Sequence, residues 1–297
     1  MNQDEILSRP TRAISAAQRE AYFRDGFVAL PGFLDAAWLA RLRATTADFV
    51  EESRTCTTSN EKFDLEPDHS AAAPRLRRLS FPVDHHATYR QLTFDSPIAD
   101  VVEDLLGPDF CYHHSKLNFK WSGGGEQVHW HQDIQFWPHT DYSPLTLGIY
   151  LEDVDDSMGP MGLVPGSHRG PLYDLCDASG RWTGHIAAAD LTGIDTQRAV
   201  YPTGPAGTIT VHNCCVVHGS APNLSTRVRP LLLQTYYAAD AFPLMGVGTN
   251  GLGRYANRLV RGTRPRHFSV GGRRQPVAPD WSGGYTSIFA VQGEKTD

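Results

Sequence analysis

The sequence predicts a mainly β protein with flanking helices, and two observations support this prediction. From Phe110 onward, short apolar runs alternate with turns such as Gly204-Pro-Ala-Gly207. Before that point, apolar residues recur at helical spacing between residues that commonly cap helices. Many short strands separated by glycine and proline turns are typical of a β-sandwich, a jelly roll or a barrel.

The first predicted helix has a clear start and end. Ser15 can cap its N-terminus, Gln18 three residues later completes a capping box, and Gly26 fits its C-terminal end. The segment Gly26-Phe-Val-Ala-Leu-Pro31 then predicts a short strand that proline terminates.

Two more helices and a loop complete the N-terminal part. Asp35 is expected to open a second helix, and Pro97–Gly107 is expected to be a short amphipathic helix that Gly-Pro stops. Residues 54–74 are polar and weakly patterned, which predicts a long loop.

The β-rich part follows. Six candidate strands cover residues 110–121, 127–134, 145–152, 162–165, 208–218 and 228–238. We expect a single domain over residues 1–297. Its helical part, about 11–106, would pack on a β-core of about 110–240, and residues 241–297 would form a C-terminal extension.

Composition narrows the functional classes. The net charge of −6 argues against non-specific nucleic-acid binding, and no apolar run is long enough to span a membrane. The acidic first residues do not resemble a secretory signal, and the sequence carries neither a dinucleotide-binding glycine motif nor a P-loop. Five cysteines without a C-x-x-C pair are expected to be reduced thiols, so we expect a cytoplasmic protein.

His131, Asp133 and His218 are candidate metal ligands. On an extended strand, residues two apart point to the same face, so His131 and Asp133 would converge. His218 follows a later predicted strand, where a turn would place its imidazole at the mouth of a barrel. Two histidines and one carboxylate with open coordination positions are typical of non-haem Fe(II) oxygenases.

The remaining histidines are weighed against ordinary structural roles. His129 shares the nominal strand face of His131 and could donate a hydrogen bond to a ligand. The others have no comparable spacing, and we expect them to be structural or on the surface: His85, His86, His113, His114, His139 and His212.

Arg229 is the candidate anion-binding residue. In the alternating pattern it faces the interior with Leu231 and Leu233, where an arginine is costly to bury without an anionic partner. Its planar fork matches a carboxylate. Arg227 ranks second and is expected to face solvent.

An arginine-rich segment covers residues 254–274. It contains seven arginines and no acid: Arg254, Arg258, Arg261, Arg264, Arg266, Arg273 and Arg274. It is either a solvated loop or a basic rim that attracts an anionic substrate, and the solvated loop is the simpler interpretation.

Several motifs together resemble the phytanoyl-CoA dioxygenase family, a branch of the Fe(II)/2-oxoglutarate-dependent oxygenases. These are Tyr22–Phe33, Trp130-His-Gln-Asp133, Gly162–His168, and His218-Gly-Ser220 followed by Arg229. The resemblance implies a double-stranded β-helix, a jelly roll of the cupin-like kind.

The resemblance also implies roles for individual residues. His131, Asp133 and His218 would hold Fe(II), and Arg229 and Ser220 would bind 2-oxoglutarate. Asn118 and Gln127 are weaker candidates for co-substrate contacts. Trp137 matches a cavity tryptophan of the ectoine hydroxylase branch. Apart from the resemblance, Phe136, Trp137, Tyr236, Tyr237 and Phe242 are substrate-pocket candidates, with ordinary core packing as the alternative role.

The expected activity is that of an Fe(II)/2-oxoglutarate-dependent dioxygenase. It would use O2 to hydroxylate, or otherwise oxidise, a C–H bond of a small molecule, such as a secondary metabolite or an acyl- or amino-acid-derived acid, and would release succinate and CO2. It would act as a monomer or homodimer, with neither nucleic acid nor membrane as partner. Two alternatives stay open: a catalytically silent β-barrel that binds an acidic small molecule, and a cupin-type isomerase or thiol dioxygenase.

Overall fold

The computed structural model describes residues 1–122, 126–244, 252–270, 273–278, 284 and 287–293. Residues 271–272 of the arginine-rich segment 254–274 fall outside these ranges. No helix among the described residues has both the length and the apolar character needed to cross a bilayer.

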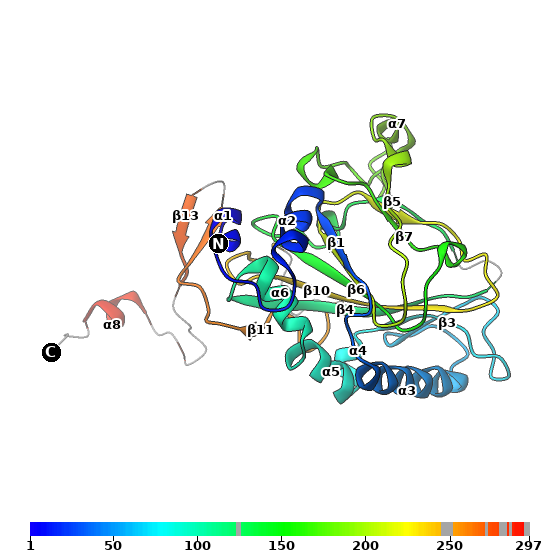
Figure 1. The fold of residues 1–297 in the computed structure, drawn as a ribbon. Coiled ribbons are helices and arrows are strands. Elements are labelled where there is room, and N and C mark those ends of the chain that lie inside the picture. The colour runs from blue at the N-terminus through cyan, green and yellow to red at the C-terminus, as the bar shows by residue number, and fades with distance from the viewer. Residues whose placement is uncertain (123–125, 245–251, 271–272, 279–283, 285–286, 294–297) are drawn as a thin grey trace.

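Two β-sheets build the core. The large sheet has the order β1-β8-β6-β10-β4-β3-β2, with β11 (Arg258–Arg261) also paired to β4. Its strands are β1 (Phe27–Leu30), β8 (Ile209–Asn213), β6 (Leu145–Tyr150), β10 (Arg229–Ala238), β4 (Phe110–Lys120), β3 (Leu76–Ser80) and β2 (Phe63–Leu65). The small sheet has the order β5-β9-β7, with β5 (Val128–His131), β9 (His218–Ser220) and β7 (Met161–Leu163). The small sheet lies over one face of the large one, which makes a jelly roll (Figure 1).

Helices cover the other face of the large sheet. They are α1 (Gln3–Leu7), α2 (Ala16–Asp25), α3 (Ala36–Glu52), α4 (Pro82–His85), α5 (Ala87–Phe94) and α6 (Ile98–Leu106). Figure 1 shows α3, α5 and α6 on the side of the sheet opposite β5 and β7. Leu117 and Phe119 of β4 belong to the apolar core shared with these helices. Because neighbouring residues of a strand point to opposite faces, Lys116, Asn118 and Lys120 of β4 face the small sheet.

The predicted helix ends are confirmed. Ser15 and Gln18 form the capping box of α2, and Gly26 ends that helix in the left-handed conformation, with φ 87°. Asp35 caps α3 by accepting a hydrogen bond from the Trp38 amide.

One predicted strand and one predicted loop differ from the structure. The predicted strand 208–218 is two strands in different sheets, because Asn213 stops β8: its side-chain oxygen accepts a hydrogen bond from the Cys215 amide, at 2.9 Å, in an Asx turn. The predicted loop 54–74 contains β2, which pairs with β3.

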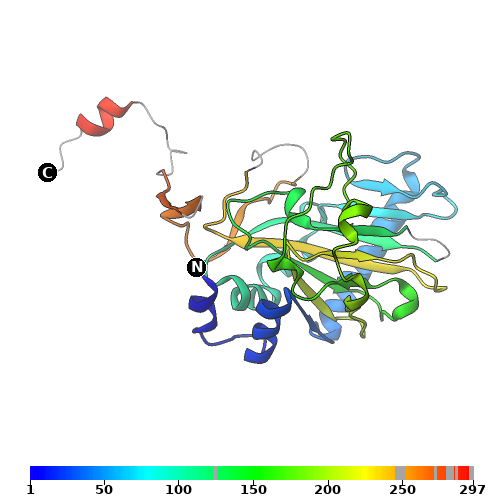
Figure 2. The ribbon, with the colours of Figure 1, turned by 90° about the horizontal axis from the view of Figure 1, so that it is seen from above.

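The remaining elements lie outside the jelly roll. They are α7 (Ala188–Leu191), the hairpin of β12 (His267–Val270) and β13 (Arg273–Pro276), and α8 (Ile288–Gly293). Short 3-10 helices at Ser53–Thr55, Asp133–Gln135, Asp156–Met158, Ser167–Arg169 and Thr196–Arg198 lie in the connections between elements. Figures 1 and 2 show β13 and α8 extending away from the core. All five cysteines are free, as expected.

Candidate iron and co-substrate site

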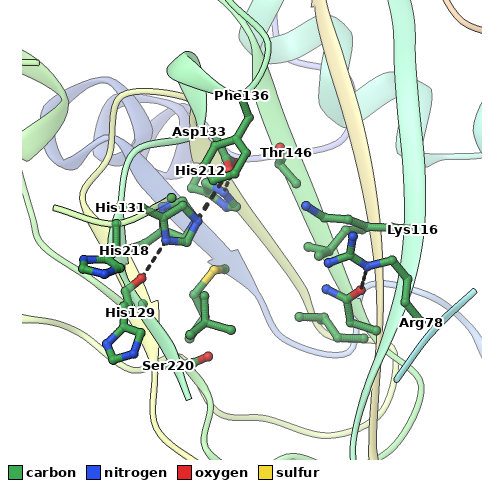
Figure 3. A pocket seen from close by; sticks show the side chains of 18 of the residues that line it. Arg78, Lys116, His129, His131, Asp133, Phe136, Thr146, His212, His218 and Ser220 are labelled. Carbon is green, nitrogen blue, oxygen red and sulfur yellow. Dashed lines mark hydrogen bonds and ion pairs between the residues drawn. The ribbon is translucent and has the colours of Figure 1, made fainter. Parts of the chain in front are cut away.

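Three predicted ligands converge at one end of the small sheet. His131 ends β5 and lies opposite His218, the first residue of β9. Asp133 Oδ1 lies 3.7 Å from His131 Nε2 and 3.9 Å from His218 Nε2. One potential ligand atom from each residue lies within 4.8 Å of the other two, and all three side chains are largely buried (Figure 3). These three groups are therefore placed to share one metal ion.

The convergence of His131 and Asp133 does not come from a continuous strand. β5 ends at His131, and Asp133 begins a 3-10 helix. Gln132 between them is still extended, with φ −119° and ψ 138°, so the side chains on either side of it share a face. The buried amide of Gln132 points elsewhere and donates to the Cys215 carbonyl, at 2.8 Å.

Backbone carbonyls orient both imidazoles. The Nδ1 of His131 donates to the His129 carbonyl at 2.8 Å, and the Nδ1 of His218 donates to the Val216 carbonyl at 2.9 Å. A proton on Nδ1 leaves the Nε2 lone pair of each ring free to bind a metal. The prediction for His129 was therefore incomplete, because its backbone carbonyl makes this contact while its side chain is exposed.

His212 holds the carboxylate, which the sequence did not reveal. It is 1% exposed, and its Nε2 donates to Asp133 Oδ2 at 3.3 Å. Burial alone would raise the pKa of Asp133, but His218, the hydrogen bond from His212 and Lys116 hold that pKa well below its usual range. Burial lowers the pKa of His218 well below its usual value. The site thus presents a carboxylate and neutral imidazole, the protonation states that a metal requires.

A second cluster surrounds Arg229 on the large sheet. Arg229 begins β10, is 4% exposed, and lies opposite Lys120 of β4. Its Nε and Nη1 have no hydrogen-bond partner in the described part of the chain. Lys120 donates to the hydroxyl of Ser220 at 2.7 Å and to the Ala221 carbonyl. Buried cations with unsatisfied donors fit an anionic ligand such as a carboxylate.

One cavity of about 470 Å3 joins the two clusters. It is lined by His131, Asp133, His218, Arg229, Ser220, Gln127 and Asn118 among others. Gln127 lies exposed at the rim, and the amide oxygen of Asn118 accepts a hydrogen bond from Arg78 Nε at 2.9 Å.

The predicted aromatic residues divide into two groups. Trp137 is buried in the cavity wall, and Phe136, which is 42% exposed, lies edge-on to His131 with 5.7 Å between the ring centroids. Tyr237 does not line the cavity, because its ring packs against His113 and its hydroxyl donates to Asn257 at 2.9 Å. Two further candidates, Tyr236 and Phe242, do not line the cavity either.

The arginine-rich segment does not form a rim around this cavity. None of its described arginines lines the cavity. Arg261 pairs with Asp100 at 2.6 Å and Glu103 at 2.8 Å, both on α6. Arg227 is solvent-facing, as expected, and pairs with Asp155 at 2.5 Å.

Four further residues of the site were not identified from the sequence. Arg78, His114 and Lys116 line the cavity, and Lys120 donates a hydrogen bond to its lining residue Ser220. A signal for three of them existed, because 114, 116, 118 and 120 alternate along one strand and therefore share a face. A polar strand face normally indicates exposure to solvent, whereas this face of β4 is turned toward the cavity.

The comparisons with known proteins agree with this geometry. The family model described as phytanoyl-CoA dioxygenase (PhyH) matches residues 22–231. A probable alpha-ketoglutarate-dependent hypophosphite dioxygenase of Stutzerimonas stutzeri is 33% identical over 249 residues, which cover 83% of this chain and 86% of that protein. An L-proline trans-4-hydroxylase of Streptomyces griseoviridis is 30% identical over 235 residues, 72% of this chain and 83% of that protein.

A solved structure extends the likeness to the fold. EctD from S. alaskensis with bound Fe superposes with a TM-score of 0.68 at 25% identity, covering 90% of each chain. The predicted jelly roll and the predicted cofactors are thereby confirmed. The chain belongs to the phytanoyl-CoA dioxygenase family and is an Fe(II)- and 2-oxoglutarate-dependent dioxygenase.

Proposed function

We propose that this enzyme oxidises a small molecule inside the 470 Å3 cavity, with His131, Asp133 and His218 as its iron ligands. The observation that carries the proposal is the meeting, in one cavity, of a two-histidine, one-carboxylate cluster and an unpaired buried guanidinium. Such a ligand set leaves open coordination positions, and the guanidinium can bind an acidic co-substrate.

Arg229 is proposed to bind the far carboxylate of 2-oxoglutarate. In support, Arg229 lines the cavity, two of its buried donors lack a partner in the described chain, and Lys120 donates to the hydroxyl of Ser220, another lining residue. Asn118 and Gln127 line the same cavity, and we retain them as minor contacts.

Iron and 2-oxoglutarate supply the oxidising chemistry, with release of succinate and CO2. The protein's own residues position the reactants and exclude water. Phe136 shields the side of the cavity next to His131, and Trp137 forms the wall beside His114. Asp133 fills the carboxylate position of the triad, which favours hydroxylation over halogenation.

We propose a C–H bond as the default target of hydroxylation. The proteins similar to this chain are named for hypophosphite, L-proline and ectoine, all of which are small and carry an anionic oxygen group. These three compounds form the first panel to test. The single-domain organisation, the monomeric or homodimeric state and the cytoplasmic location stay predictions.

The test is an anaerobic titration of the protein with Fe(II) and 2-oxoglutarate, followed by succinate measurement after O2 is admitted. We expect the weak visible band of a metal-bound keto acid, and succinate release that the true substrate accelerates. A protein that binds 2-oxoglutarate without this band and releases no succinate would be a silent binding module, contrary to the proposal.

A further inference from the structure

Two cations of the cavity have no proposed contact with iron or with 2-oxoglutarate. Lys116 projects from β4 and Arg78 from β3, and both line the cavity. Figure 3 shows them on the wall opposite His131, Asp133 and His218. Arg78 is held in place by its hydrogen bond to Asn118.

Neither cation has an acidic partner at close range. No carboxylate in the described part of the chain lies within ion-pair distance of Lys116 or Arg78, and Asp133 is the one acid among the residues that line the cavity. The nearby acids Asp64 and Glu126 pair instead with Arg77, at 3.9 and 3.6 Å.

Iron binding would leave this wall still more positive. Burial lowers the pKa of Lys116, and Asp133 offsets that effect in part. Once Asp133 binds a divalent cation, its negative charge no longer compensates Lys116. The two charges of 2-oxoglutarate are matched by the metal and by Arg229, so the charges of Lys116 and Arg78 still lack a counter-ion.

The strand register places this pair away from the co-substrate cluster. Lys120 lies opposite Arg229, whereas Lys116 lies opposite Leu233. Four residues along a strand separate the two lysines by roughly 13 Å, at about 3.3 Å per residue. The cavity therefore has one cationic cluster at Arg229 and another at Lys116.

We infer that the substrate is a small molecule with an oxyanion group, a carboxylate or a phosphorus oxyanion, which Lys116 and Arg78 bind while its reacting bond faces the triad. This inference rests on the proposed function and names its substrate class. The volume supports a small substrate: 470 Å3 is near the lower end of the range of about 300–1,000 Å3 for ligand pockets, and 2-oxoglutarate shares it. A whole acyl-CoA would leave most of its length outside.

The test measures probe binding without turnover. The protein is loaded anaerobically with Fe(II) and 2-oxoglutarate. Hypophosphite, acetate, L-proline and the two amides acetamide and L-prolinamide, in which an uncharged amide replaces the carboxylate, are then titrated while the visible band is recorded. We expect the anionic probes to perturb the band at lower concentration than the amides. In Lys116→Met the dissociation constant of the anions should rise about tenfold or more, the effect of losing a hydrogen bond to a charged group.

Arg77→Met is the matched control. It removes one positive charge from β3, the strand of Arg78, but Arg77 pairs with acids and does not line the cavity, so probe binding should change less than twofold. Equal responses to anions and amides, or unchanged anion binding in both Lys116→Met and Arg78→Met, would overturn the inference. So would a Lys116→Met variant that loses 2-oxoglutarate instead of the probe. Failure of the proposed function would appear differently, as a wild-type protein that forms no band at all.

Discussion

Arg229 and Lys120 lie opposite each other on neighbouring strands, buried, with no carboxylate within ion-pair distance in the described chain. Burial and the charge of Arg229 lower the pKa of Lys120 to about 7, and burial lowers the pKa of Arg229 to about 10. Two cations so close together are unfavourable in the folded protein until an anion binds between them.

The first prediction follows from the pKa of Lys120. Above pH 7, Lys120 in the free protein is mostly neutral, so binding of a dianion must take up a proton. The dissociation constant of 2-oxoglutarate should therefore rise by about tenfold between pH 7 and 8.5, since a group that takes up one proton changes affinity by up to tenfold per pH unit. Anaerobic titrations with Fe(II) present at each pH measure this.

Lys120→Met provides the comparison. It should bind 2-oxoglutarate more weakly at pH 7 but with little pH dependence, whereas Arg227→Met should keep the wild-type slope. A wild-type affinity that is level over this range would show that Lys120 does not titrate with the co-substrate.

The second prediction separates the two arginines. Arg229→Met should weaken 2-oxoglutarate binding about 10- to 150-fold, the range for a hydrogen bond to a charged group, and leave Fe(II) binding unchanged. Arg227→Met should have no effect, because Arg227 is exposed and pairs with Asp155. Similar losses in both variants would show that Arg229 was the wrong choice.

The same variant, Arg229→Met, also leads to a prediction about thermal stability. It removes a buried charge that has no ionic partner in the described structure, so the metal-free variant should unfold at a temperature no lower than that of the wild type. A marked decrease would mean that Arg229 already has a stabilising partner in the free protein.

The sequence was sufficient to predict the parts of the site that obey local rules. The spacing of His131 and Asp133 works because Gln132 is extended, and Arg229 occupies the interior face that its alternation with Leu231 predicts. Likewise, Ser15 and Gly26 bound their helix as their side-chain chemistry requires. Each of these predictions depends on backbone geometry over a few residues.

The parts that were missed depend on contacts between distant segments. His212 touches Asp133 because β8 lies beside the site, a relation that no spacing in the sequence expresses. The alternation of Lys116 and Lys120 with apolar residues looks like that of a strand with one face in water. A strand with one face toward a polar cavity shows the same alternation of polar and apolar residues. Tyr237 had the alternation expected of a pocket residue, yet it packs behind the cavity against His113.

The third prediction concerns iron affinity. Asp133→Ala should abolish Fe(II) retention. His212→Leu should weaken Fe(II) binding about 10- to 100-fold, the usual effect of removing a partner that orients a ligand. His212→Gln, which keeps a donor for Asp133, should lose less. Anaerobic equilibrium binding of Fe(II) measures all three, and equal affinities of the Leu and Gln variants would remove the orienting role of His212.

The last prediction uses the buried histidines behind the cavity. Burial lowers the pKa of His113 to about 3 and that of His139 to about 4, and both rings pack against Tyr237. Both folded-state values lie below the unfolded value of about 6.5, so the unfolded chain binds more protons in this range. The free energy of unfolding should therefore be highest above pH 6.5 and fall as the pH drops toward 4.

For His139 alone, about 1.4 kcal/mol per pH unit between 6.5 and 4 gives a loss of roughly 3 kcal/mol. Urea unfolding of the metal-free protein at pH 7.5 and pH 4.5 measures the loss. His139→Phe, which keeps an aromatic ring beside Tyr237, should lose less stability between the two pH values than the wild type. The exposed His129 serves as control, since His129→Phe should lose as much as the wild type. A His139→Phe variant with an undiminished loss would show that His139 is not buried in its neutral form.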